Sequence, residues 1–402
     1  MADTGDTLTI QPTALVSLLE STHIPHQLVP YRGVLTPRQL DAPEMEIAAL
    51  SAGAAVHDLG WMRRVDVRGQ DRFRWLSGMV TNTVNDLFPN SGAWNFILNA
   101  QGRIQGDLTV WRAGEEPSAA RRAAELIDKK DADCMGGTPF AGESALELEI
   151  AADQFEKLMA HLNRFIIMDD VELVPLGEDQ GSEVDSQTAI GLTGPLADEV
   201  LERVGLPTMA QPMTGKSVEW NGWDLRILRN YGTLVPHYEF FLPGAGLAKL
   251  WSCLRTAGAK PVGSQSLEAF RVAEGIPLYG IDIAERDLPQ ETSQMRALHF
   301  NKGCYLGQEI VERIRSRGNV HRHLRPMELS GPVPPANTDL VLENGSAAGR
   351  ITSAAELPLA SGSRCFALGL VQAEAESQTA EFHYTACGET GTARILAAPP
   401  SL

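Results

Sequence analysis

The sequence lacks several features by which a protein class is recognised at once. Its 402 residues contain no apolar run close to the roughly 18 residues that would span a bilayer. The five cysteines are scattered, odd in number and without a Cys-x-x-Cys pair, which argues against a disulfide scaffold and against a metal site built from cysteines. No Gly-x-Gly-x-x-Gly loop, metal-ligand cluster or Ser/His/Asp order stands out. We therefore expect no metal site.

Basic residues are also in short supply. The chain has 34 Lys and Arg against 51 Asp and Glu, a net charge of −17. Such a surface repels nucleic acid, so we expect no stable nucleic-acid binding. The acidic start, from Met1 to Asp6, has neither the layout of a secretory signal nor the Arg-rich face of a transit peptide. These absences predict a cytoplasmic protein with no membrane association.

What is present is the composition of a folded, globular chain. With 43% hydrophobic and 21% charged residues, it has ample material for a buried core, and its length predicts two or three domains. Residues 1–45, punctuated by prolines after a short helix at Ala14–Leu19, indicate an appendage. Short apolar stretches after Pro326 indicate a small all-β domain. Strands and helices alternate irregularly elsewhere, which favours an α+β fold over a doubly wound one.

One hairpin is predicted from local signals. Trp94–Leu98 and Ile104–Trp111 read as strands around the turn Asn99–Gly102, which puts Asp107 on the returning arm. A carboxylate there can orient an amine or a protonated ring nitrogen, although a surface acid in a turn is the alternative. Residues 113–143 read as an inserted surface loop. Helices are also expected at 71–79, 153–165, 245–257 and 264–274.

The stretch Asn301–Glu309 is the densest in chemically versatile side chains. It places Cys304 between Gly303 and Gly307, next to Lys302 and just before a predicted helix. A neighbouring cation and a helix amino terminus both favour the thiolate, the reactive form of cysteine. A structural cysteine at the start of a helix is the alternative, and spacing alone does not choose between the two.

A basic segment follows at residues 313–325. It contains five arginines and two histidines with no acid among them. The segment could hold an anionic ligand tail, an acidic partner or RNA phosphates. Cations that suit the carboxyl end of a helix, followed by a solvated linker, are the alternative.

Taken together, these windows resemble one known group of proteins. Lys302–Glu309 resembles the signature of the YgfZ-type folate-binding proteins, bacterial relatives of a mitochondrial iron–sulfur assembly factor. Their superfamily includes the glycine-cleavage T-protein, which is an aminomethyltransferase. Residues 99–110, Arg271–Gly280 and Leu288–Glu291 resemble further segments of that superfamily, and the resemblance covers roughly residues 46–400.

The resemblance implies a three-domain, T-protein-like ring around a central folate channel, with a small C-terminal β-barrel. The first domain would span 46–150, interrupted by the 113–143 insertion and completed by 260–325. The second domain would span 151–259, and the barrel 326–402.

It also implies a function. The chain would be a tetrahydrofolate-binding accessory protein that supports assembly or repair of iron–sulfur enzymes, with these enzymes or assembly factors as partners and Cys304 as its functional residue. One cysteine cannot hold a cluster that needs four thiolates, so any cluster contact would be transient or shared. The alternative is a folate-dependent aminomethyltransferase that uses Asp107 and acts on a lipoylated carrier or a free methylated amine. A third reading is an RNA-binding module at 313–325.

Particular site residues follow from the resemblance. Asp107 would face the pterin or its reactive nitrogen, and Val235 stands where aminomethyltransferases carry a pterin-binding glutamate. Losing that carboxylate would leave a pterin donor unmet, at a cost of about 1–3 kcal/mol, which weakens the transferase reading. The remaining predicted cofactor contacts are Arg271, Tyr238, Lys302 and Tyr305.

Overall fold

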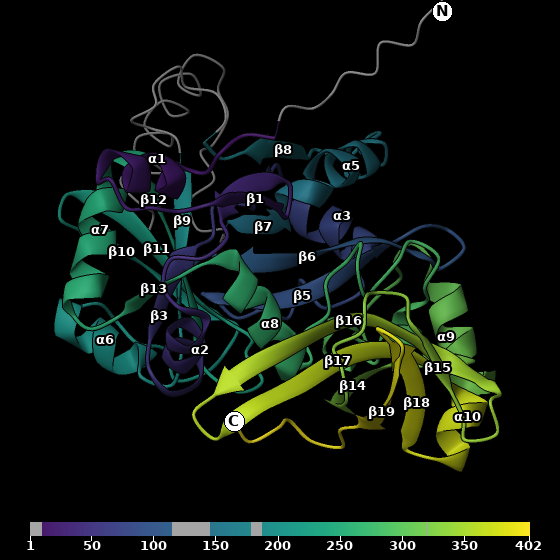
Figure 1. Ribbon diagram of the computed structural model, residues 1–402. Helices are drawn as coiled ribbons and strands as arrows, with labels where there is room; N and C mark the ends of the chain where they lie inside the picture. Colours follow the sequence, from purple (N-terminus) through teal and green to yellow (C-terminus); the bar gives the residue numbers. More distant parts are fainter. Residues whose placement is uncertain (1–9, 115–144, 178–186, 319) are drawn as a thin grey trace, which may run out of the picture.

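The computed structural model describes residues 10–114, 145–177, 187–318 and 320–402 (Figure 1). Within these residues, eleven strands form one mixed sheet in the order β13-β3-β9-β12-β11-β10-β5-β6-β7-β4-β8, and six further strands close a barrel. The mixed sheet and the separate carboxyl-terminal barrel confirm the predicted α+β class. No helix of the described residues is long and apolar enough to cross a membrane.

One half of the sheet carries the predicted hairpin. Strands β5 and β6 pair antiparallel with Phe96 opposite Asp107, so the hairpin is confirmed. Most of the predicted insertion at 113–143 lies outside the described residues. The elements of this half are β4 (Met62–Arg68), α3 (Arg72–Met79), β5 (Ser91–Leu98), β6 (Ile104–Arg112), β7 (Leu146–Ala151), α5 (Ala152–Asn163) and β8 (Glu172–Pro175).

The packing of this half continues past the predicted domain boundary at residue 150. Phe155 and Leu158 of α5 pack in the same hydrophobic cluster as Val65 of β4 and Leu148 of β7. Strand β8 also pairs with β4. The packing therefore changes between β8 and β9, at least 25 residues after residue 150.

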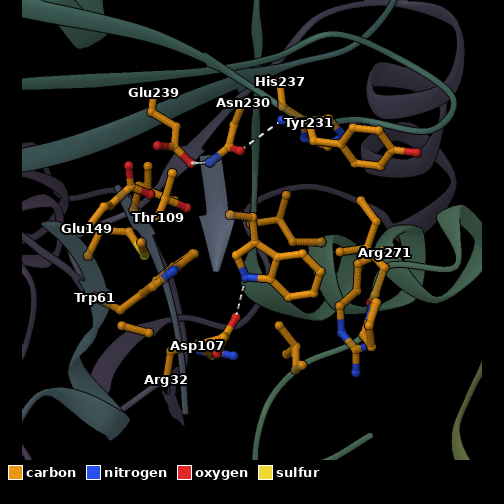
Figure 2. A pocket seen from close by; sticks show the side chains of 18 of the residues that line it. Arg32, Trp61, Asp107, Thr109, Glu149, Asn230, Tyr231, His237, Glu239 and Arg271 are labelled. Atoms are coloured by element: carbon orange, nitrogen blue, oxygen red, sulfur yellow. Dashed lines mark hydrogen bonds between the residues drawn. The ribbon is translucent and has the colours of Figure 1, made fainter. Parts of the chain in front are cut away.

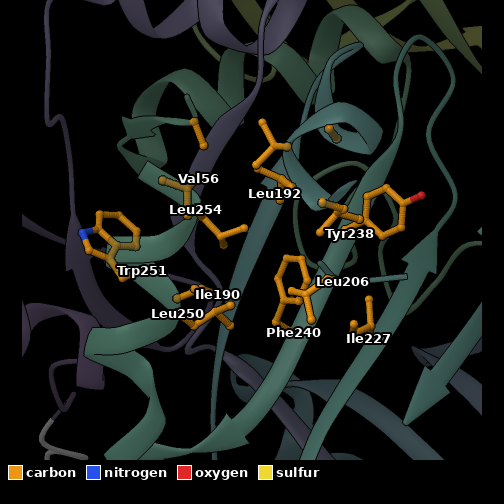
Figure 3. Packing of buried hydrophobic residues seen from close by; sticks show 14 of the residues in the cluster. Val56, Ile190, Leu192, Leu206, Ile227, Tyr238, Phe240, Leu250, Trp251 and Leu254 are labelled. Carbon is orange, nitrogen blue, oxygen red and sulfur yellow. The ribbon is translucent and has the colours of Figure 1, made fainter. Parts of the chain in front are cut away.

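The other half of the sheet has its own core (Figure 3). Phe240 of β12 and Leu250 of α7 are both fully buried there. Helix α6 ends at Gly205 in the left-handed conformation, with φ of 72°, which glycine adopts without a Cβ clash. This half contains β3 (Ala55–Asp58), β9 (Gln187–Thr193), α6 (Ala197–Val204), β10 (Thr214–Trp220), β11 (Trp223–Asn230), β12 (His237–Pro243), α7 (Gly244–Thr256) and β13 (Lys260–Val262).

The described part of the amino-terminal segment, from residue 10 onward, packs against this core. Helix α1 (Ala14–Ser21) lies beside α7 (Figure 1), and its Leu15 and Leu19 belong to the same buried cluster as Leu250. The hairpin of β1 (Leu28–Tyr31) and β2 (Val34–Pro37) and helix α2 (Pro43–Ala52) continue across the body.

The carboxyl-terminal barrel packs on helix α8 (Ser264–Glu274), which contacts β16 and β17. The barrel begins with β14 (Arg322–Ser330), four residues before the predicted start, and α9 (Gln308–Arg317) precedes it. Its other elements are β15 (Asp339–Val341), β16 (Ala347–Leu359), β17 (Gly362–Gln372), α10 (Ala373–Gln378), β18 (Glu381–Ala386) and β19 (Glu389–Ile395).

Candidate functional site

A cavity of about 270 Å³ lies between one face of the sheet, helix α8 and the segment after it (Figure 2). Strand alternation explains its lining, because successive side chains of a strand point to opposite faces. On β6, β7 and β12 the odd-numbered residues Asp107, Glu149 and Glu239 line the cavity. Even-numbered neighbours such as Leu148 of β7 and Phe240 of β12 enter the hydrophobic cores instead. The sheet therefore presents a polar row of side chains to the cavity.

Asp107 is held in this cavity by two neutral donors. Its Oδ2 accepts a hydrogen bond of 2.8 Å from Trp94 Nε1, and its Oδ1 accepts one of 2.8 Å from Gln154 Nε2 (Figure 2). Gln154 Oε1 in turn accepts from the Asp107 backbone N–H at 3.0 Å. Asp107 is thus a positioned carboxylate, not a surface acid in a turn.

Two buried carboxyl groups face each other at one end of the cavity (Figure 2). Glu149 Oε2 accepts from Trp111 Nε1 at 2.8 Å, and Glu239 Oε1 accepts from Asn230 Nδ2 at 2.9 Å. Burial and the neighbouring Glu239 carboxylate raise the pKa of Glu149 well above its usual range. Burial likewise raises the pKa of Glu239. The two carboxyl groups also hydrogen-bond to each other.

A guanidinium group lies among the aromatic side chains of the cavity. The Arg296 guanidinium carbon is 3.6 Å from the ring centre of Tyr231 and 4.8 Å from that of Trp94. Its buried Nε and Nη1 have no hydrogen-bond partner within the described part of the chain. Burial lowers the pKa of Arg296 to about 10, which leaves the side chain cationic at neutral pH. This group can donate hydrogen bonds to an anionic or carbonyl atom of a ligand.

Glu274 organises the loop that precedes β12. Its Oε1 accepts from the backbone N–H groups of Thr233 and Leu234 at 3.1 and 3.0 Å. Its Oε2 lies 2.8 Å from His237 Nε2. Burial works to lower the pKa of His237, but the Glu274 carboxylate outweighs it and the pKa is raised.

The substitution at Val235 does not deprive the cavity of a carboxylate. Val235 packs against the hydrophobic cluster of Phe270 and Val272 and is not among the residues that line the cavity. Glu239, four residues later, lines it instead. The predicted cost of the missing pterin acceptor at Val235 stays a prediction, and the cavity has another carboxyl group in Glu239.

Arg271 lines the cavity, but its donors are used within the protein. Nε and Nη2 bond to Glu268, Nη1 bonds to Ile276 O and Asp282, and Nη2 also donates to Ser353. A guanidinium has five N–H donors, so little capacity is left for a ligand. The predicted folate contact of Arg271 stays a prediction, whereas its visible role is to join α8 to the barrel.

Three other predicted contacts lie outside the cavity lining. Tyr238 is 1% exposed and points to the core of the opposite sheet face, where its hydroxyl bonds to Asp198 (Figure 3). Lys302 Nζ donates to the backbone oxygens of Val80 and Asn82, and burial lowers the pKa of Lys302 to about 7. Tyr305 is buried in a cluster with Phe96 of the hairpin. The observed contacts of all three side chains are with other parts of the protein.

Cys304 is exposed and does not line the cavity. The rest of its motif packs on the hairpin. Gly307 has a φ of 82°, and a Cβ added there would lie 2.6 Å from Asn99 O. The backbone N–H of Leu306 donates to Gly78 O at 2.9 Å. The structure thus places the motif against the hairpin that carries Asp107. The Cys304 thiol, however, does not line the cavity that contains the Asp107 carboxylate.

The basic segment is partly neutralised within the protein. Arg322 bonds to Asp287 and Glu291, and Arg325 forms an ion pair of 2.7 Å with Glu376. These acids come from other segments, which is why the sequence window alone looked uncompensated.

Among the cavity residues that the sequence did not predict are Glu149, Glu274 and Arg296. Glu149 had a usable signal, since Leu146–Ile150 alternates and a strand with an acid at every second position presents a polar face. The other two lie at a helix end and in a short turn, where no periodicity marks the direction of a side chain.

Comparisons with known proteins agree with this architecture. Residues 26–135 match the family model of the GCVT N-terminal domain. An aminomethyltransferase of Geobacillus kaustophilus is 24% identical over 380 residues, covering 92% of this chain and 93% of the relative. A chloroplastic transferase-like protein of Arabidopsis thaliana is 24% identical over 347 residues, covering 84% of this chain and 69% of the relative.

One solved structure shows the same fold. The crystal structure of aminomethyltransferase T of the glycine cleavage system from Bartonella henselae superposes with a TM-score of 0.78 at 19% identity, covering 97% of this chain and 98% of that one. The fold is therefore that of a glycine-cleavage T-protein. The family match and these relatives together support a place in the T-protein superfamily.

Proposed function

We propose that this chain is a tetrahydrofolate-dependent, aminomethyltransferase-like enzyme whose catalytic carboxylate is Asp107. The observation that carries the proposal is the fixed orientation of that carboxylate in the cavity, between Trp94 Nε1 and Gln154 Nε2. The similarity to aminomethyltransferases supports the reaction class.

The cavity residues fit a flat, hydrogen-bonding heterocycle such as a pterin. Trp94 and Tyr231 supply aromatic surfaces, and the carboxyl groups of Glu149 and Glu239 add polar groups to the same cavity. Small-molecule sites typically combine such apolar walls with a few placed polar groups. When bound, tetrahydrofolate would supply nitrogen atoms that accept a one-carbon unit.

Asp107 would orient the reacting amine and move its proton. Each of its oxygens accepts one hydrogen bond from the protein and keeps a further lone pair for a ligand. A positioned carboxylate can take a proton as the carbon–nitrogen bond forms and return it to the departing amine. Trp94 and Gln154 would keep the carboxylate aimed throughout, since both donate from side chains fixed by the sheet and α5.

Calorimetric titration with tetrahydrofolate tests the cofactor. We expect binding in the micromolar range, accompanied by quenching of tryptophan fluorescence because Trp94 lines the cavity. Asp107→Asn should bind nearly as well, since the amide keeps one acceptor oxygen. Absence of binding by the wild-type protein at high folate concentration would remove the proposal.

Cys304 favours a second candidate function, an accessory role for iron–sulfur enzymes. Its thiol is exposed just ahead of α9, where a protein partner can reach it. In a deletion strain, Cys304→Ala should then fail to restore iron–sulfur enzyme activity. Cys387→Ala is the matched control, because Cys387 is also exposed but lies in the barrel. Equal rescue by both variants would eliminate this role for Cys304.

A further inference from the structure

We infer that Glu274 and His237 are positioning residues: they end a hydrogen-bonded chain that holds one extra proton and fixes the loop between β11 and β12. Thr193 and His57 complete the chain. The effect on ligand affinity rests on the proposed function, whereas the chain itself is a property of the unliganded protein.

The chain crosses three neighbouring strands of the sheet. His57 of β3, Thr193 of β9 and His237 of β12 follow one another because these strands are adjacent. His57 Nε2 lies 3.0 Å from Thr193 Oγ1, which lies 3.2 Å from His237 Nδ1. His237 Nε2 lies 2.8 Å from Glu274 Oε2. All four side chains line the cavity.

Hydrogen-bond direction fixes how many protons the chain holds. At one end the backbone oxygen of Asp58 only accepts, so His57 Nδ1 donates to it at 2.8 Å. At the other end the carboxylate of Glu274 accepts from His237 Nε2. The four hydrogen bonds of the chain need four hydrogens, whereas two neutral imidazoles and one hydroxyl supply three. The chain is therefore complete only with one extra proton.

The extra proton belongs to His237. Glu274 Oε1 accepts from two backbone N–H groups, which favours the ionised carboxylate beside the His237 ring. His57 is buried between a carbonyl and a hydroxyl group, so a charge there would be costly. The directions of the two pKa shifts agree: burial lowers the pKa of His57, whereas the Glu274 carboxylate outweighs burial and raises the pKa of His237.

The other charged groups around His237 do not reverse this balance. Glu239, on the same strand, also raises the pKa of His237. His57 faces it from β3 and is neutral. Arg296, from the segment after α8, interacts with the same Glu274 carboxylate and competes for it. The hydrogen-bonded ion pair with the fully buried Glu274 outweighs that competition.

The loop that this chain fixes forms one wall of the cavity. Residues 231–236 join β11 to β12, and Glu274 Oε1 holds the backbone N–H groups of Thr233 and Leu234. The loop begins with Tyr231, whose ring covers the Arg296 guanidinium. Figure 2 shows Tyr231 and His237 at one end of the cavity and Asp107 at the other. The chain therefore shapes the wall against which a ligand binds and leaves the catalytic carboxylate to other partners.

NMR titration of the histidine side chains tests the extra proton. The His237 signal is assigned by its absence from His237→Asn, and in the wild-type protein it should titrate above its ordinary value of 6.5. Glu274→Gln keeps the Oε1 acceptor, and its amide can donate to His237 Nε2, so the chain is complete without the extra proton. His237 should then be neutral at pH 7. An unchanged His237 titration in Glu274→Gln would overturn the inference.

Steady-state kinetics of ammonia release from an aminomethylated lipoyl carrier test the positioning role. Glu274→Ala leaves two backbone N–H groups without their acceptor and should raise the KM for tetrahydrofolate by about 10-fold or more. The kcat should stay within a few-fold, because Asp107 is held by Trp94 and Gln154. Glu274→Gln should restore a KM close to that of the wild type at pH 7.

The pH profile is a readout that a purely structural role would not move. Because the pKa of His237 is raised, its contribution is present at lower pH and is lost as pH rises. The wild-type KM should therefore rise in the alkaline range, whereas that of Glu274→Gln should stay flatter. Glu156→Gln, which removes an exposed carboxylate of α5, is the control and should follow the wild type.

The outcomes separate the chain from the proposed function. A wild-type KM in a folded Glu274→Ala, or an equal pH dependence in wild type and Glu274→Gln, would overturn the positioning role. If Glu274→Ala does not fold, the titrations and pH profiles of the other two proteins decide. Failure of the wild-type protein to bind tetrahydrofolate would overturn the proposed function, and the histidine titrations would still test the chain.

Discussion

At the scale of single residues, the cavity is built from polar groups whose partners are fixed by the fold. Asp107 and Glu239 each accept a hydrogen bond from a neutral donor. Glu274 accepts from two backbone N–H groups of the loop before β12. His57 of β3 also lines the cavity. Its Nδ1 lies 2.8 Å from Asp58 O and its Nε2 lies 3.0 Å from Thr193 Oγ1. Such fixed partners favour one charge state for each group.

His57 should make the protein sensitive to acid. Burial lowers the pKa of His57 to about 4, below its ordinary value of 6.5. The folded state then binds fewer protons than the unfolded chain between these values, so the free energy of unfolding should fall as pH drops from 6.5 to 4. The full loss is on the order of 3 kcal/mol. Denaturant unfolding of wild type and His57→Gln across this range measures it.

The difference between the two curves isolates this residue from other titrating groups. His57→Gln should be less stable than wild type at neutral pH and should lose less stability on acidification. Equal slopes for the two proteins would show that His57 does not titrate on unfolding in this window.

The sequence predicted the position of Asp107 on the hairpin, but it did not predict that Glu149 lines the cavity. Asp107 follows a turn whose signals, Asn99 and Gly102, are local, so its place on a hairpin arm can be read from the chain. The partnership of Glu149 and Glu239 joins strands β7 and β12, which no local pattern brings together. The position of Tyr238 in the core was missed for a related reason, because the register of β12 decides which of two neighbouring side chains faces the cavity.

At the scale of elements, the cysteine motif packs on the hairpin and supports its position. Gly307 lies against Asn99 and Gly102, and Lys302 ties the motif to the chain that leaves α3. Sequence reasoning gave the motif a chemical role because its residue types are reactive. The structure adds that its glycines and lysine support the arm on which Asp107 sits.

Gly307→Ala should destabilise the protein more than Gly303→Ala. Gly307 has a φ of 82°, and its added Cβ would lie 2.6 Å from a backbone oxygen. The left-handed conformation alone costs alanine about 1–2 kcal/mol, to which the clash adds. Gly303 has no atom within 4 Å of an added Cβ, so Gly303→Ala should change stability by about 0.5 kcal/mol or less. Denaturant unfolding measures the free energy of unfolding of both variants. Equal losses of stability would contradict the packing role of Gly307.

At the scale of the whole molecule, buried polar contacts join the barrel to the body. Asp282 accepts from Thr352 and Ser353 of β16 and from Arg271 of α8. The α+β class and the barrel were predictable from the change in pattern after Pro326. The packing of α1 into the core and the place of α5 were not, because they depend on long-range contacts.

Asp282→Asn should loosen this junction. The change leaves the buried Arg271 charge with a weaker partner, and breaking a buried ion pair typically costs about 3–5 kcal/mol. Glu199→Gln, in an exposed pair with Arg203, is the control and should cost about 1 kcal/mol or less. Thermal unfolding compares the two variants. A stability loss for Asp282→Asn no larger than that of the control would contradict the assigned role of the junction.

The most direct test of the central claim is a transfer assay with an aminomethylated lipoyl carrier. Ammonia release is measured with and without tetrahydrofolate, alongside folate binding, for the wild-type protein and Asp107→Asn. We predict folate-dependent release by wild type and a loss of about 10²–10⁴-fold in the variant with folate affinity nearly unchanged. Folate binding without any release by wild type, or full activity in Asp107→Asn, would contradict the account.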